Sequence, residues 1–190
     1  LTCNGEIYNF RKLKKELVAL GHRFRTKTDT EVIIHLYEEA GDRCLDSLVG
    51  MFAFAIWDGR RNRLLLARDR VGEKPLYYAS RRDELAFGSE VRALLRVPWI
   101  QPNLNREAVA SLMVYQSSPS PLTMFQDIHS LAPATKLVWE RGRLTESRYW
   151  SLDFSKRRNW RYPDALEAYD SCVRRSVENC LEADVSVGVM

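Results

Sequence analysis

The stretch that decides the fold is Met51-Phe52-Ala53-Phe54-Ala55-Ile56-Trp57, in which large apolar residues alternate with alanine. This pattern predicts a strand buried on both faces, because successive side chains of a strand point to opposite sides of the sheet. Asp58 to Asn62 has the composition of a turn, and Arg63 to Arg68 returns as a second strand. The centre of the molecule is therefore expected to be an antiparallel hairpin.

Further elements on both sides of this hairpin alternate without a regular strand–helix order. Two more hairpins are expected, over residues 76–87 and 134–150. Helices are expected over residues 10–20, 29–40, 43–48, 90–97, 105–115 and from 163 onward. Asn9 is expected to cap the first helix, and Thr28 with Glu31 to form a capping box on the second. Such a mixture favours an α+β fold packed in layers.

Composition limits the kind of protein. The chain has 190 residues and a mass of 22.1 kDa, which is enough for one domain and part of another. Of its residues, 45% are hydrophobic and 28% are charged, which is typical of a globular protein. No run approaches eighteen apolar residues, and no signal peptide is recognisable at Leu1. The four cysteines form no CxxC pair, which predicts reduced thiols in a cytoplasmic protein. His22, His35 and His129 are scattered and predict no metal site.

The net charge is +4, but it is unevenly spread. Between Lys136 and Arg161 there are eight Lys or Arg and three Asp or Glu, and Trp139, Tyr149, Trp150 and Trp160 are interleaved with them. A nucleic-acid surface can have this composition, since bases stack on aromatic rings. A hairpin with solvated charges followed by a linker explains it better, because no nucleic-acid-binding motif accompanies it. We expect neither a nucleic-acid nor a membrane partner.

The chemistry of the sequence is concentrated in Asn4-Gly5-Glu6-Ile7-Tyr8-Asn9. A strand ending at Cys3 would deliver Asn4 and Gly5 to a turn. There the Asn4 amide and the Gly5 N–H could converge on one developing oxyanion. Asn-Gly is also a common hairpin turn. Here, however, it leads into a helix, which favours a functional interpretation.

Asp29 supplies a carboxylate near the start of the second helix, where it could hold a ligand's ammonium group or only offset the helix dipole. No convincing nucleophile accompanies these groups. Cys3 adjoins the donors, but a buried thiol without a basic neighbour is expected to be protonated and inert. The sequence therefore predicts the oxyanion-binding and substrate-binding groups of an amide-hydrolysing site, without its nucleophile.

Several blocks strongly resemble the glutamine-hydrolysing asparagine synthetases, and the resemblance runs from end to end of the chain. They are NGEIYN (4–9), TDTEV (28–32), GMFAFAIWD (50–58), RDRVGEKPLYY (68–78) and FGSE (87–90). The resemblance implies a class II glutamine amidotransferase domain with the four-layer αββα amino-terminal-nucleophile fold, truncated here. It also implies that Asn4 and Gly5 form the oxyanion hole, while Glu6 and Asp29 hold the α-amino end of glutamine.

The same resemblance implies a domain organisation. Residues 1–150 are expected to be a partial amidotransferase domain, 151–162 a linker, and 163–190 the first helix and partial strand of an α/β ATP-pyrophosphatase-type synthetase domain. The family's catalytic cysteine and its ATP loop are expected outside this chain, so the chain alone is expected to be inactive. The whole protein would use glutamine, aspartate, ATP and Mg²⁺, and a homodimer is a candidate assembly.

Two alternatives stay open at this stage. One is a related amide ligase, such as a β-lactam-forming synthetase or an amidotransferase acting on cell-envelope sugars, because the acceptor pocket belongs to the synthetase domain. The other is a non-catalytic scaffold that keeps the fold without the nucleophile. The sequence flanking both ends would distinguish them.

Overall fold

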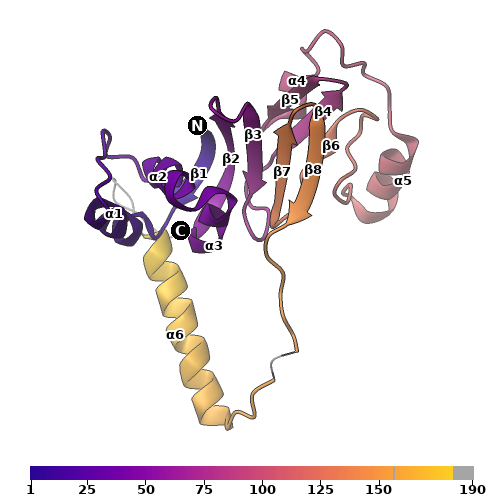
Figure 1. The fold of residues 1–190 in the computed structure, drawn as a ribbon. Helices are drawn as coiled ribbons and strands as arrows, with labels where there is room; N and C mark the ends of the chain where they lie inside the picture. The colour runs from indigo at the N-terminus through magenta and orange to yellow at the C-terminus, as the bar shows by residue number, and fades with distance from the viewer. Residues whose placement is uncertain (156, 182–190) are drawn as a thin grey trace.

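The computed structural model describes residues 1–155 and 157–181, and its centre is a five-stranded antiparallel sheet (Figure 1). The strand order is β1-β2-β3-β7-β8. The strands are β1 (Thr2–Ile7), β2 (Gly50–Asp58), β3 (Arg63–Arg68), β7 (Thr135–Glu140) and β8 (Arg143–Arg148). The predicted central hairpin is confirmed as β2 and β3, with Ala55 opposite Leu66.

A second, three-stranded antiparallel sheet has the order β5-β4-β6. Its strands are β4 (Tyr77–Arg81), β5 (Glu84–Gly88) and the two-residue β6 (His129–Ser130). The predicted hairpins over 76–87 and 134–150 are thereby both confirmed, one in each sheet.

The alternation in β2 explains how the two sheets stack. Phe52, Phe54 and Ile56 pack into one hydrophobic core, whereas Ala53 and Ala55 pack into another on the opposite face. The large side chains meet the helices α1 (Phe10–Ala19), α2 (Glu31–Ala40) and α3 (Cys44–Ser47), with the 3-10 turn η1 (Gly41–Arg43) between the last two. The alanines leave room for the side chains of the smaller sheet, such as Leu76 and Tyr78.

The outer face of the smaller sheet has its own core. Ala79 packs there with Leu94 of α4 (Val91–Leu94) and with Ile100 and Ile128 from the following loops. Helices, the large sheet, the small sheet and a further helix thus follow one another through the molecule (Figure 1). The α+β class is confirmed, and α4 is shorter than the helix predicted over 90–97.

Three predictions about how strands and helices begin or end are wrong. β1 runs through Asn4 and Gly5 without a turn, because both residues are paired with β2. Asn9 does not cap α1; its side chain accepts from Val49 N–H and donates to the Ser47 carbonyl, at 3.0 and 2.9 Å. Thr28 and Glu31 form no capping box, since α2 begins at Glu31 and the Glu31 carboxylate accepts instead from Arg25 and Thr26.

Helices α5 (Arg106–Tyr115) and α6 (Tyr162–Cys180) follow the predictions more closely. Asn105 caps α5 by accepting from Glu107 and Ala108 N–H, and Pro163 lies in the first turn of α6. Most of α6 stands apart from the sheets in Figure 1, and its apolar stripe is exposed: Leu166, Tyr169, Val173, Val177 and Leu181. The strand predicted over Val185–Met190 lies outside the described residues. Among those described, no helix is both long and apolar enough to cross a bilayer.

The loop after β3 is organised by the fully buried carboxylate of Asp69. Its Oδ1 accepts from the N–H groups of Val71, Gly72 and Glu73, at 2.6–3.1 Å. Its Oδ2 accepts from Lys74 at 3.0 Å and from Phe52 of β2 at 3.3 Å. One side chain therefore shapes the loop and fastens it to the central strand.

Replacing Asp69 by Asn is expected to destabilise the fold by at least about 3 kcal/mol, because an NH₂ group would face buried N–H donors. Urea unfolding measures this loss. Asp127→Asn, at an exposed position, is the control and should change the free energy of unfolding little. Similar losses in the two variants would contradict the role given to Asp69.

A second polar cluster joins η1 to the large sheet. Asp42 lies 2.7 Å from Arg63 of β3 and 2.9 Å from Lys136 of β7, and all three side chains are largely buried. Burial alone would raise the pKa of Asp42, but hydrogen bonds from Lys136 and Arg63 lower it overall. The carboxylate form is therefore the one that stabilises this corner.

Asp42→Asn is expected to cost roughly 1–3 kcal/mol at neutral pH, since it leaves two cations without their partner. Because the folded-state pKa is lowered, the contribution is present above the ordinary aspartate pKa of about 4 and disappears as the pH falls below it. Denaturant melts of wild type and variant should therefore converge in acid. Asp46→Asn, an exposed neighbour, should show no comparable pH-dependent difference.

Candidate active site

Three of the four predicted site residues, Asn4, Gly5 and Glu6, lie along β1, which is an edge strand of the sheet among the described residues. The N–H of Tyr8, just beyond the strand, donates to the Val49 carbonyl across from it. In an antiparallel pair, such bonds alternate along the strand. The uninterrupted register from Thr2 to Ile7 therefore directs the N–H groups of Gly5 and Ile7 away from β2, toward the open edge.

Asp29 lies at this open edge. Its Oδ2 accepts the Ile7 N–H at 2.6 Å, although the two residues are 22 apart in the chain. Gly5 is two residues from Ile7, so its N–H points the same way about 7 Å along the strand. The structure thus brings the Asp29 carboxylate to the edge that carries the Gly5 N–H.

The segment that carries Asp29 is held by Glu31. The Glu31 carboxylate accepts from the N–H groups of Arg25 and Thr26, each at 2.7 Å, and from the Thr26 hydroxyl. Burial would raise the pKa of Glu31, but these hydrogen bonds lower it to about 2. Glu31 is therefore ionised at neutral pH and fixes the loop in front of α2.

The side chains of Asn4 and Glu6 are exposed, whereas Cys3 and Ile7 on the other face of β1 contact the helical core. The alternation of the strand sets this division. The Asn4 amide and the Glu6 carboxylate are accessible to a ligand.

Gly5 has a structural reason to be glycine besides any chemistry. Its φ is +151°, and a Cβ there would lie 2.1 Å from the Met51 carbonyl oxygen and 2.6 Å from Phe52 Cα. Any other residue would push β1 away from β2. The identity of residue 5 is thus required by this close approach, whatever its N–H does.

Cys3 is half-buried on the face of β1 that packs against the helices, and it is not an activated nucleophile. Burial, and next the negative charge of Asp29, raise the pKa of its thiol to about 11. Burial likewise raises the pKa of Cys44 to about 12. Both thiols are therefore protonated at neutral pH, as the sequence predicted for Cys3.

We expect iodoacetamide at about pH 8 to label Cys3 at least about 100-fold more slowly than an ordinary exposed thiol, because only the thiolate reacts. Peptide mass spectrometry measures the labelling, with exposed Cys172 as the internal reference. Labelling in urea should make the two rates similar. Equal rates in the folded protein would contradict the protonated state.

A surface cavity of about 1250 Å³ lies elsewhere, at the far end of β2. Its lining includes Tyr37, Asp42, Trp57 and Arg63, and none of the four predicted site residues. The candidate site is therefore an open strand edge and not this cavity.

Two polar residues hold the edge in place: Asn9, for which the sequence predicted a different role, and Asp69, for which it predicted none. Asn9 ties the end of β1 to the start of β2, and Asp69 holds β2 from its other side. The signal for Asp69 was present in the block RDRVGEKPLYY, where a carboxylate precedes a glycine-containing loop. Arg68 in the same block donates to the carbonyls of Gly72, Lys74 and Leu131.

An edge that presents N–H donors beside a carboxylate can hold a ligand with both a polarised carbonyl and an ammonium group. The glutamine amidotransferase domain family matches residues 1–150 of the chain. The chain belongs to this family.

Among curated proteins, it is similar to asparagine synthetase (glutamine-hydrolysing) 3 of Bacillus subtilis, 38% identical over 185 residues. It is also similar to asparagine synthetase (glutamine-hydrolysing) 2 of the same organism, 39% identical over 199 residues. These alignments cover 97% and 98% of this chain but only 30% and 26% of the relatives. The chain thus spans less than a third of their length.

A solved structure shows the same fold. It is glutamine phosphoribosylpyrophosphate amidotransferase from B. subtilis, with a TM-score of 0.53 at 22% identity. The match covers 78% of this chain and 28% of the other. The α+β arrangement of antiparallel sheets and helices is thus that of an amidotransferase.

Proposed function

We propose that this chain is the glutamine-binding part of an asparagine synthetase-type protein, which hydrolyses glutamine and uses the ammonia to amidate aspartate. The observation that carries the proposal is the position of Asp29 at the strand edge to which the Gly5 N–H points. The family match and the two curated relatives support it. In this proposal the fold is the αββα amino-terminal-nucleophile sandwich.

Each predicted residue has a role in the proposed hydrolysis. A cysteine thiolate supplied from outside the described residues attacks the side-chain carbonyl of glutamine, and the carbonyl oxygen becomes an oxyanion. The Asn4 amide and the Gly5 N–H donate to that oxyanion. Collapse of the intermediate expels ammonia, which carries the proton lost by the attacking thiol, and leaves a glutamyl thioester that water hydrolyses to glutamate and the free thiol. Asp29 and Glu6 bind the α-ammonium group; an ionised carboxylate such as Asp29 accepts several hydrogen bonds, so the Ile7 N–H leaves it free to do so.

The rest of the proposal concerns the second half of the protein. Residues 151–162 are a linker and residues 163–190 begin the synthetase domain, where ATP, Mg²⁺ and aspartate bind. Its acceptor pocket decides between aspartate and another acid, so a related amide ligase would share every feature of residues 1–150. The assembly proposed is a homodimer of the complete protein in the cytoplasm.

The full-length gene product allows a direct test of the site. Asn4→Ala is expected to lower kcat of glutamine hydrolysis by roughly 100- to 1000-fold, because one oxyanion donor is lost. Asp29→Asn is expected to raise KM for glutamine at least about tenfold, because the ammonium loses a charged partner. Glutamate release measures both, and Asp127→Asn is the matched control at an exposed site.

Unchanged kinetics in Asn4→Ala and Asp29→Asn would overturn the assignment of these residues. The 190-residue chain alone is expected to release no glutamate above a Cys3→Ala control, since Cys3 is protonated and half-buried. A scaffold without catalysis would show no glutaminase activity in the full-length product either.

A further inference from the structure

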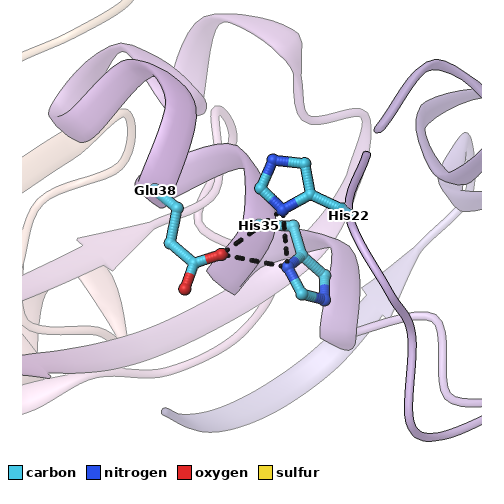
Figure 2. A group of neighbouring side chains, drawn as sticks. All are labelled: His22, His35 and Glu38. Atoms are coloured by element: carbon cyan, nitrogen blue, oxygen red, sulfur yellow. Dashed lines mark hydrogen bonds and ion pairs between the residues drawn. The ribbon is translucent and has the colours of Figure 1, made fainter. Parts of the chain in front are cut away.

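Two histidines that are 13 residues apart in the chain meet beside α2 (Figure 2). His22 follows the end of α1, and His35 and Glu38 lie on α2. The Nδ1 atoms of His22 and His35 are 3.1 Å apart. Glu38 Oε2 lies 3.4 Å from His22 Nδ1 and 3.1 Å from His35 Nδ1. The prediction that the histidines are scattered is therefore wrong for this pair.

The outer nitrogen of each ring faces a carboxylate. His22 Nε2 is 2.8 Å from Glu39 Oε1, which makes Nε2 the protonated nitrogen of a neutral ring. His35 Nε2 is buried and 3.6 Å from Glu31 Oε1, beyond hydrogen-bonding distance but directed at a negative charge. In the tautomer with both protons on Nε2, the two Nδ1 lone pairs and the Glu38 oxygen lie together with no hydrogen among them, and one cation can bind all three. With a proton on Nδ1, the same atoms share a hydrogen bond instead.

The spacing of these three atoms identifies the cation. Zn–N bonds of about 2.0–2.1 Å in tetrahedral geometry place neighbouring ligand atoms about 3.3 Å apart. The observed separations of 3.1, 3.1 and 3.4 Å are close to this value. Ligating histidines also characteristically donate their other N–H to a carboxylate, as His22 Nε2 can donate to Glu39 here.

We propose that His22 Nδ1, His35 Nδ1 and Glu38 Oε2 bind a divalent transition-metal ion, with Zn²⁺ the ion that their chemistry and geometry fit best. Imidazole and carboxylate together suit Zn²⁺ and do not suit Mg²⁺, which prefers oxygen ligands. The Glu38 side chain is half exposed, so the fourth position faces water. Glu31, Glu38 and Glu39 make the surroundings of the two rings negative.

The ion would link the end of α1 to the middle of α2 and so close the segment between them. That segment, residues 22–30, carries Asp29 to the edge of β1. The metal ion would thus stabilise the Asp29 loop, residues 22–30, by holding the flanking helices together. It stands on its own geometry and does not depend on the proposed glutaminase activity.

Calorimetric titration of the metal-free 190-residue chain with Zn²⁺ at about pH 7.5 tests the proposal. The protein should carry Cys172→Ser and Cys180→Ser, so that its exposed thiols do not compete for zinc. One equivalent should bind, and it should raise Tm; Mg²⁺ at the same concentration should do neither. Long-range ¹H–¹⁵N spectra should show zinc on both Nδ1 atoms, with the protons on Nε2.

Substitutions of the proposed ligands and of their neighbours test where the zinc ion binds. His35→Asn and Glu38→Gln should each weaken zinc binding, the histidine change by at least about 100-fold, whereas Glu39→Gln should weaken it by roughly 10- to 100-fold. His129→Asn removes the chain's third histidine, outside the cluster, and should leave affinity unchanged. Glu38 is exposed enough for its variant to fold even if His35→Asn does not.

Two results would overturn the proposal. One is the absence of saturable zinc binding, with spectra showing a proton shared between the two Nδ1 atoms. The other is that Glu38→Gln binds zinc with the same affinity as the protein in which Glu38 is unchanged.

Discussion

The fold depends on a buried negative charge that is neutralised almost entirely by backbone N–H groups. The Asp69 carboxylate accepts five such bonds and lies where β2, β3 and the loop to the smaller sheet meet. The Asp69 backbone carbonyl also accepts from Ala134 N–H, at the entrance to β7. The large sheet and the connection to the second sheet are therefore fixed by one residue, and the hydrophobic cores pack around this frame.

Other parts of the chain use the same chemistry on a smaller scale. Asp29 holds β1 and Asn9 holds the β1–β2 end by accepting backbone N–H groups of distant segments, and Glu31 holds the loop just before α2 in the same way. Polar side chains that would ordinarily cap their own helices are used here across the structure. This explains how an exposed strand edge keeps a defined shape.

The regular elements were predictable because their patterns are local. The hairpins follow from alternation and turn composition, and the cap at Asn105 lies within three residues of its donors. The cap expected at Asn9 was wrong because tertiary partners competed for its side chain, which bonds to residues about 40 positions away. The capping box expected at Thr28 was wrong because Glu31 accepts instead from Arg25 and Thr26 in the loop just before the helix. The approach of His22 to His35 depends on the angle between two helices, which no short pattern in the sequence encodes.

The tight contact at Gly5 has a consequence that reaches beyond its own strand. Gly5 is paired with Phe52, whose N–H and carbonyl are both bonded to Asp69. A methyl group at position 5 would therefore strain not only the sheet edge but also, through the single residue Phe52, the loop on the opposite side of β2. Two separate regions of the fold thus require glycine at this position.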